Sequence, residues 1–262
     1  MKKSPEILFR ELLDIMDKLR VECPWDKKQD IHSLRHLTIE ETYELADAIM
    51  LDDYQEIKKE LGDILLHIVF YAKIGSERGG NEHFDVSDVI ESINEKLIRR
   101  HPHIFSDVKA DTDEDVKVNW EKIKLKEKDR DSVLSGVPTS LPSLIKAYRI
   151  QDKAHGIGFD WDNANQVWEK VEEEIDELQE ELKLQDNKEN IEMEFGDLLF
   201  ALVNYARFID VNPETALERS NKKFISRFTD VERVAKERGK SISEMSLEEM
   251  ELIWQEVKKY SK

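Results

Sequence analysis

The sequence contains little cysteine, glycine and proline, and no long uninterrupted apolar segment. Cys23 is the only cysteine among 262 residues, so an intrachain disulfide is excluded and a cytoplasmic location is expected. Nine glycines and six prolines leave long stretches free to form helices. The longest apolar run, from Ile64 to Ala72, is interrupted by His67 and is too short to cross a bilayer. We therefore expect a soluble, mainly helical protein without a membrane segment.

Positive charge is also scarce relative to negative charge. The chain has 40 lysines and arginines against 58 aspartates and glutamates, which gives a formal net charge of −18. Nucleic acids and anionic membranes attract basic surfaces, so no general affinity for either is expected. An anionic small molecule would reach this protein together with a metal cation.

One pattern of carboxylates occurs twice. Residues three apart lie on the same face of a helix, so each Glu-x-x-Glu or Glu-x-x-Asp pair directs two carboxylates to one point. Turn signals separate the two pairs of each set, around Asp52 in the first and from Gln185 to Lys188 in the second. Each set therefore predicts an antiparallel helical hairpin with four converging carboxylates. The first set is Glu41, Glu44, Glu60 and Asp63, and the second is Glu174, Glu177, Glu194 and Asp197.

Converging carboxylates repel one another unless a cation neutralises them or they take up protons. All eight are hard oxygen donors, which favour Mg²⁺, with Mn²⁺ as a substitute, over zinc, copper or an iron-sulfur centre. With 58 acidic residues, a single pair would most simply be a solvated helix face. The recurrence of two paired motifs, whose first and third members are 19 and 20 residues apart, favours metal binding.

The similarity of the two halves extends beyond the carboxylates. Trp25 and Asp26 precede the first set as Trp161 and Asp162 precede the second, and an apolar helix follows each set. We predict an all-α fold of two tandem helical-bundle domains, residues 1–134 and 148–262, joined by a linker at 135–147 that is rich in Ser, Gly and Pro. An apolar hairpin must be covered by further helices or another chain, so a homodimer is expected.

Basic and aromatic residues recur at matching places after each set. A basic pair four residues apart shares a helix face and could hold phosphate oxygens, although a solvated basic face is the simpler alternative. A tryptophan could stack on a base or belong to the core, and an asparagine could orient phosphate or sugar or cap a helix. These residues are Lys96, Arg100, Trp120 and Asn94 in the first half, and Lys223, Arg227, Trp254 and Asn221 in the second.

His67 lies four residues after Asp63 and could supply a nitrogen ligand. Its counterpart in the second half is Ala201, which favours a core position, or one behind the ligands, over direct coordination. Neither half has the Glu-x-x-His pair of ferritin-like di-iron proteins at the motif. A di-iron centre is therefore not expected.

Together these motifs resemble the MazG family of nucleoside triphosphate pyrophosphohydrolases, in its two-domain bacterial form. The resemblance covers nearly the whole chain. It implies an all-α fold, obligate dimerisation, Mg²⁺ dependence, and hydrolysis of nucleoside triphosphates to monophosphates and pyrophosphate. The segments that carry it are Cys23-Pro24-Trp25-Asp26, Glu40-Glu41-Thr42-Tyr43-Glu44, Glu60-Leu61-Gly62-Asp63, Gly158-Phe159-Asp160-Trp161, Glu173-Glu174-Ile175-Asp176-Glu177 and Glu194-Phe195-Gly196-Asp197.

The resemblance also implies roles by position, with the C-terminal half as the main catalytic one. Glu173, or Glu40 in the first half, is a candidate for orienting the attacking water. The implied metal ligands are Glu174, Glu177, Glu194 and Asp197, with Glu41, Glu44, Glu60 and Asp63 in the first half. The nucleotide-binding candidates are Lys223 and Arg227 for phosphates, Trp254 near the base, Asn221, Lys170, and in the first half Lys96, Arg100 and Trp120.

Two alternatives stay open from the sequence. One keeps the fold but restricts the substrate to a single nucleotide such as dUTP or dCTP. The other is a non-catalytic acidic helical dimer that binds partners without metal. A permissive enzyme could serve nucleotide-pool cleansing or stress regulation, and the sequence does not distinguish these roles.

Overall fold

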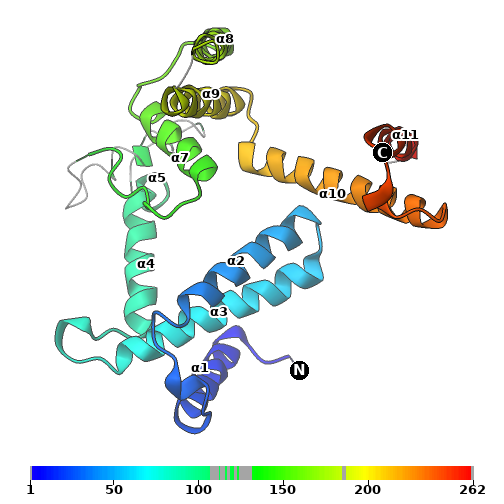
Figure 1. Cartoon of the computed structure of the whole chain (residues 1–262). Coiled ribbons are helices and arrows are strands. Elements are labelled where there is room, and N and C mark those ends of the chain that lie inside the picture. The colour runs from blue at the N-terminus through cyan, green and yellow to red at the C-terminus, as the bar shows by residue number, and fades with distance from the viewer. Residues whose placement is uncertain are drawn as a thin grey trace. The chain divides into compact units, whose positions relative to one another are not determined.

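The computed structural model describes residues 2–106, 112, 116, 119–120, 123, 132–184 and 187–260. Within these ranges the secondary structure is helical, without strands, which confirms the predicted all-α class (Figure 1). The chain divides into two compact units, Met1–Lys109 and Ala110–Lys262. No helix in the described part of the chain is long and apolar enough to cross a membrane.

The N-terminal unit is built around the hairpin of α2 and α3. α2 ends at Met50, Asp52 adopts a left-handed φ of 53°, and the Asp53 side chain accepts hydrogen bonds from two backbone N–H groups in the first turn of α3. This confirms the turn predicted around Asp52. The elements are α1 (Pro5–Glu22), η1 (Asp26–Lys28), α2 (Arg35–Met50), α3 (Tyr54–Ser76), η2 (Gly80–Glu82), α4 (Val86–Arg100) and α5 (Pro102–Phe105).

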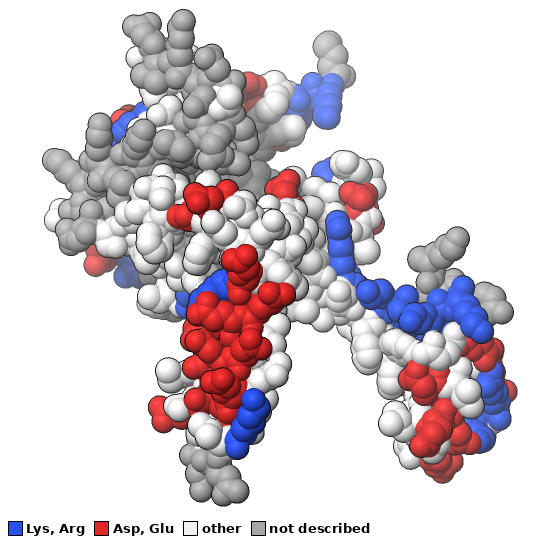
Figure 2. Space-filling model, turned by 90° about the horizontal axis from the view of Figure 1, so that it is seen from above, with Lys and Arg blue, Asp and Glu red and all other residues white. Residues whose placement is uncertain are grey.

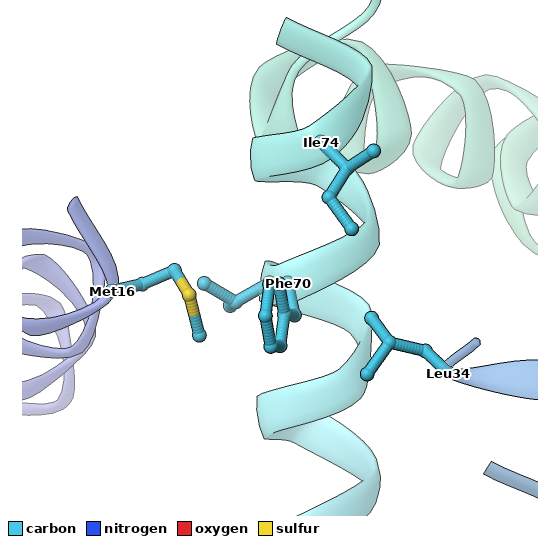
Figure 3. Close-up of a cluster of buried hydrophobic side chains, with 5 residues drawn as sticks. Met16, Leu34, Phe70 and Ile74 are labelled. Carbon is cyan, nitrogen blue, oxygen red and sulfur yellow. The ribbon is translucent and has the colours of Figure 1, made fainter. Parts of the chain in front are cut away.

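The core of this unit lies where α1 crosses the C-terminal half of α3. Met16 of α1, Leu34 just before α2, and Phe70 and Ile74 of α3 bring their side chains together (Figure 3). Each is at most 3% exposed. Burying side chains of this size contributes about 1.5–3 kcal/mol apiece, so this cluster fixes the far end of the hairpin.

The C-terminal unit contains a second hairpin, formed by α8 and α9. Asn163 caps α8 by accepting hydrogen bonds from the backbone N–H groups of Asn165 and Gln166. Trp168 meets Tyr205 across the hairpin with ring centroids 4.9 Å apart. Gln185 and Asp186, at the centre of the predicted turn, lie outside the described residues. The elements are α7 (Ser143–His155), α8 (Ala164–Glu181), α9 (Lys188–Phe208), α10 (Pro213–Glu237), η3 (Ile242–Glu244) and α11 (Leu247–Tyr260).

Residues 213–260 form what we call the C-terminal arm. Pro213 occupies the first turn of α10, and α11 folds back on that helix (Figure 1). Val231 and Ala235 of α10 pack against Ile253 and Val257 of α11 in a small core. The arm therefore has a hydrophobic cluster of its own.

The predicted linker, residues 135–147, falls within the second compact unit. α7 begins at Ser143, so the last residues of that predicted linker are helical. The boundary between the two compact units falls between Lys109 and Ala110, which lie outside the described residues. The domain limits 1–134 and 148–262 stay a prediction.

An ion-pair network fixes the segment that leads into α8. Asp160 accepts from Arg207 Nη2 at 2.5 Å and contacts His155 Nδ1 at 2.6 Å. The Asp160 side chain is 13% exposed and that of Arg207 is 11% exposed. The network ties the segment between α7 and α8 to the last turn of α9, and so sets where the second hairpin begins.

The Asp160→Asn substitution is expected to destabilise the C-terminal unit by about 2–3 kcal/mol, because it leaves a largely buried guanidinium without its anion. The midpoint of thermal unfolding should fall by roughly 5–10 °C. The exposed Asp162 provides a matched control, and Asp162→Asn should change stability by less than about 0.5 kcal/mol. Equal effects of the two substitutions in urea denaturation would contradict this role for Asp160.

Candidate metal and nucleotide site

Both hairpins bring three of their four predicted carboxylates together. The N-terminal cluster consists of Glu41, Glu44 and Glu60, and each residue offers an oxygen within 4.8 Å of the others. The C-terminal cluster consists of Glu174, Glu194 and Asp197, which meet the same criterion. Each cluster joins the two helices of its hairpin, as the spacing of the motifs predicted.

The fourth member of each predicted set lies beside its cluster rather than in it. Asp63 is outside the N-terminal cluster, yet it is the carboxylate that acts most strongly on Glu41. Glu177 is exposed and outside the C-terminal cluster, yet it interacts with Glu174 and Glu194. The two halves therefore omit different positions of the repeated motif.

Loss of hydration and mutual repulsion both raise the pKa values of carboxyl groups at these hairpins. Burial raises the pKa of Glu41, and the nearby Asp63, Glu44 and Glu60 carboxylates raise it further. Loss of hydration raises the pKa of Glu177, and Glu174 raises it further, while Lys170 opposes this change. Raised carboxyl pKa values mark places where negative charge has been gathered at a cost to the fold.

One carboxylate of each cluster is buried and neutralised by a lysine. Glu174 is 6% exposed, and its Oε1 lies 2.7 Å from Lys170 Nζ, which also contacts Glu173 Oε1 at 2.8 Å. Glu60 is 3% exposed, and its Oε1 lies 3.2 Å from Lys59 Nζ. In the C-terminal hairpin the buried carboxylate, Glu174, lies on the first helix, α8. In the N-terminal hairpin the buried carboxylate, Glu60, lies on the second helix, α3.

Lys170 does not balance the negative charge of α8, the first helix of the second hairpin. Figure 2 shows acidic side chains covering the visible face of this hairpin, and both basic and acidic side chains along the C-terminal arm. Lys170 is the one basic residue of α8. The acidic residues of that helix are Glu169, Glu172, Glu173, Glu174, Asp176, Glu177, Glu180 and Glu181.

Divalent cations are expected to stabilise the chain more at pH 7.5 than at pH 4.5. An acid whose pKa is higher in the fold than its ordinary 4.5 destabilises the fold when ionised. For Glu41 this cost is absent below pH 4.5, begins as the pH rises past that value, and is complete above the raised folded-state pKa. A bound cation needs the ionised carboxylates and offsets the cost.

Thermal unfolding with Mg²⁺ or with chelator at the two pH values measures this difference. At a hundredfold excess over the dissociation constant, a stabilisation of about 2.7 kcal/mol is expected at pH 7.5, and much less at pH 4.5. The Glu41→Gln and Glu177→Gln double variant should show a smaller pH effect. An equal Mg²⁺ effect at both pH values would contradict binding through these carboxylates.

The predicted phosphate and base contacts of the second half lie together on the C-terminal arm. Lys223 and Arg227 share one face of α10, and Phe224 between them lies 5.3 Å from Trp254 of α11, measured between ring centroids. Trp254 also packs against the small core of the arm, as the alternative core role required. In the part of the chain that the structure describes, no ion pair joins Lys223 or Arg227 to the C-terminal cluster.

The first-half counterparts lie on or after α4. Lys96 and Arg100 share a face of α4 and are half-buried, and Trp120 is half-buried with most of its sequence neighbours outside the described residues. Asn94 and Asn221 lie inside α4 and α10, so the interpretation of these residues as helix caps was wrong. Asn221 Nδ2 instead donates to Glu218 Oε2 at 3.2 Å.

One charged neighbour of the clusters was missed from the sequence. Lys59 precedes Glu60 directly, and hydrogen bonds to Glu56 and Glu60 raise its pKa. Adjacent helix positions point about 100° apart, so the spacing argument gave no reason to join them. Only the length of the lysine side chain allows the contact.

Comparison with known proteins identifies the family. The profile of the MazG nucleotide pyrophosphohydrolase domain matches residues 29–105 and 163–232, which contain both hairpins and both clusters. The chain belongs to the MazG family. The first matched segment ends shortly after α4, the helix that carries Lys96 and Arg100. The second ends within α10, the helix that carries Lys223 and Arg227.

Three relatives align with 90% or more of this chain. The chain is 43% identical over 255 residues to the nucleoside triphosphate pyrophosphohydrolase of Escherichia coli K12, which covers 95% of this chain and 96% of that protein. It is also 43% identical over 260 residues to the Thermotoga maritima nucleoside triphosphate pyrophosphohydrolase/pyrophosphatase MazG, covering 98% of each. An uncharacterized Bacillus subtilis protein, YabN, is 47% identical over 238 residues, which are 90% of this chain and 48% of YabN.

Proposed function

We propose that this protein is a Mg²⁺-dependent hydrolase that converts nucleoside triphosphates to monophosphates and pyrophosphate, with Mn²⁺ as a substitute metal and broad tolerance of the base. The observation that carries the proposal is the pair of carboxylate clusters at the two places where the MazG domain matches. Relatives that align over nearly the whole chain are named for this activity.

The donor set of each cluster fits a divalent cation. All contributing atoms are carboxylate oxygens, which Mg²⁺ and Mn²⁺ accept, and Glu60 Oε2 is buried without a hydrogen-bond partner among the described residues. Glu174, Glu194 and Asp197, with Glu177 beside them, would hold the ion in the C-terminal site. The bound metal supplies charge neutralisation for the triphosphate and for the departing pyrophosphate.

Side chains of the second hairpin would bind and orient the reactants. Lys170 lies against Glu173 and Glu174, where its ammonium group can turn from carboxylates to phosphate oxygens. Glu173 is more exposed than Glu174 and faces the same lysine, so we assign it the positioning of the attacking water. We propose the C-terminal site as the main catalytic one, with Glu40 holding the equivalent position in the first half.

A homodimer would complete the substrate site. The metal ligands lie on α8 and α9, whereas Lys223, Arg227 and Trp254 lie on an arm whose α11 packs on α10. Both surfaces are apolar as well as charged: Phe195 and Leu199 are 53% and 46% exposed, and Phe224 is 57% exposed. We propose that the arm of a second copy covers the hairpin of the first, bringing cations to the triphosphate.

The test is a panel of ribo- and deoxyribonucleoside triphosphates incubated with the full chain and Mg²⁺ or chelator. Chromatography should show monophosphate and pyrophosphate from several bases, only with metal. Release from dUTP or dCTP alone would replace broad tolerance with a restricted substrate. Diphosphate and phosphate as products, or no hydrolysis, would overturn the proposed reaction.

A further inference from the structure

The C-terminal unit contains a cavity of about 610 Å³ that the proposed reaction does not use. It lies where α7 meets the C-terminal half of α9, with the segment between α7 and α8 along one side. In the described part of the chain, its lining includes neither the clustered carboxylates nor the nucleotide-binding candidates. Sites for small molecules have volumes of about 300–1,000 Å³, so this cavity has the size of a ligand site.

The N-terminal unit fills the corresponding place with its own side chains. Leu34 and Phe70 pack together there, and each is at most 2% exposed (Figure 3). The ring of Trp25 meets that of Phe70 with centroids 6.5 Å apart. Leu34 belongs to the eight residues, 27–34, that separate Asp26 from α2. The longer connection in the first half therefore supplies part of the core.

The second half lacks both of these filling side chains. Phe70 and Asn204 each follow the last carboxylate of their set by seven residues, so an amide replaces an aromatic ring at this position. Only Asn163 separates Asp162 from α8, so this connection has no counterpart of Leu34. These two differences account for a cavity in the second half where the first half has a packed core.

Three aromatic side chains line the cavity and stay accessible. Phe159, Trp161 and Phe200 are 80%, 47% and 42% exposed. Aromatic faces stack on flat rings of many kinds, because every such ring offers a π-face. The lining therefore favours a planar aromatic ligand over an aliphatic one.

Two amide side chains on the lining have unused hydrogen-bonding capacity. Asn204 Oδ1 accepts from Arg207 Nε at 3.2 Å and Nη2 at 2.9 Å, which fixes the amide, while Asn204 Nδ2 has no partner among the described residues. Gln151 is 7% exposed, and its Nε2 donates to the Phe200 carbonyl oxygen at 2.8 Å. Gln151 Oε1 is buried without a partner in the same part of the chain. Unpaired amide groups are costly to bury, and a ligand with a polar edge offers partners for them.

The charged residues of the described lining, Asp160 and Arg207, are already paired with each other. Asp160 also contacts His155 Nδ1. A charged ligand would lose its hydration in this cavity without gaining an opposite charge. The lining therefore favours a neutral ligand.

We infer that this cavity is a binding site for a neutral, planar aromatic molecule that carries a hydrogen-bonding edge. The flat face of the ligand stacks on Phe159 and Trp161, and its polar edge accepts a hydrogen bond from Asn204. Because the lining excludes the carboxylate clusters, the site is separate from the nucleotide site and does not need a metal ion. It stands whether or not the proposed hydrolysis does.

Fluorine NMR of 6-fluoro-2-quinolone, titrated into the full chain, tests this inference. The probe is neutral and planar, and its ring amide both donates and accepts hydrogen bonds. We expect saturable binding with a dissociation constant of about 1 mM or lower, which is reasonable for a fragment of this size. The constant should be the same with Mg²⁺ and with chelator.

Substitutions in the lining locate the bound probe. Ala154→Leu enlarges a side chain that lines the cavity and should weaken binding by about tenfold or more, whereas Ala216→Leu on α10 is the matched control and should not change it. Asn204→Leu removes the donor and should weaken binding by about 2–10-fold. Phe159→Ala removes a stacking face and should weaken it by about fivefold or more.

Phe159→Ala keeps the test decisive if circular dichroism shows that the Ala154→Leu chain is unfolded, because Phe159 is largely exposed. Absence of saturable binding, or equal binding by the Phe159→Ala chain and the unaltered chain, would overturn the inference. Competition with the Mg²⁺ complex of the α,β-methylene analogue of ATP adds a further check. Displacement of the probe by this complex would place it in the nucleotide site and would overturn the assignment of a separate site.

Discussion

The double variant Glu41→Gln and Glu174→Gln is expected to lose Mg²⁺-dependent pyrophosphate release by at least about 10³-fold. Each substitution removes an ionised oxygen from a three-carboxylate cluster, and metal assistance contributes several kcal/mol to reactions of this kind. Changing both clusters is necessary because a single substitution leaves the other site intact. Initial rates at saturating Mg²⁺ and nucleotide provide the measurement.

The control keeps the charge change but moves it away from the ligands. Asp176 is exposed on α8 and is not part of the cluster, so Glu41→Gln with Asp176→Asn should keep most of the activity. Circular dichroism confirms that both double variants are folded. Unchanged hydrolysis in the Glu41→Gln and Glu174→Gln chain would show that these clusters do not carry the activity.

Lys223→Ala with Arg227→Ala, introduced into a Glu41→Gln chain, is expected to lower kcat/KM by roughly 10²–10⁴-fold. Each lost charge-assisted contact to phosphate costs about 1.5–3 kcal/mol. A loss mainly in KM would indicate contacts made equally with substrate and transition state. Lys236→Ala, on an exposed position further along α10, is the matched control and should have little effect.

Mixing variants distinguishes contacts within a chain from contacts between chains. Glu41→Gln chains that also carry Glu174→Gln are combined with Glu41→Gln chains that carry the two alanines on the arm. Random exchange makes half of the dimers mixed, each with one intact site, so about one quarter of the Glu41→Gln activity should return. No recovery after subunit exchange would show that the arm serves its own chain.

The hairpins could be predicted because one spacing rule acted twice. Carboxylates three residues apart require a helix to converge, and the polar residues around Asp52 required a turn between two such helices. The structure ends α2 at Met50 and begins α3 at Tyr54, on either side of the left-handed Asp52. The sequence therefore predicted the place of the turn in the first hairpin correctly.

The membership of each cluster followed from the sequence only in part. Spacing places Asp63 and Glu177 on the right helix face, but it does not set the side-chain rotamer that brings an oxygen within reach of the others. It also does not tell which carboxylate becomes buried. That depends on packing between the two helices, which buries Glu60 on α3 but Glu174 on α8.

The interpretation of two asparagines as helix caps was wrong for a different reason. Asn94 and Asn221 have the residue type that caps helices, but α4 and α10 begin well before them, at Val86 and Pro213. The actual caps are Asp85 and Asn212, whose side chains accept from backbone N–H groups of the first turn. An asparagine inside a helix and an asparagine at its start look alike in the sequence, so residue type alone does not locate a helix cap.

Lys170 gives the C-terminal cluster a cation of its own. Because its ammonium group already contacts Glu173 and Glu174, a divalent ion bound there as proposed would have to displace it. A tethered group competes at a high effective concentration, so traces of free metal exchange poorly with it. Metal that arrives already bound to a triphosphate brings phosphate oxygens to receive the displaced lysine. At the proposed site, the Lys170 side chain would therefore couple loading of the metal to loading of the nucleotide, and would neutralise Glu173 and Glu174 again when both leave.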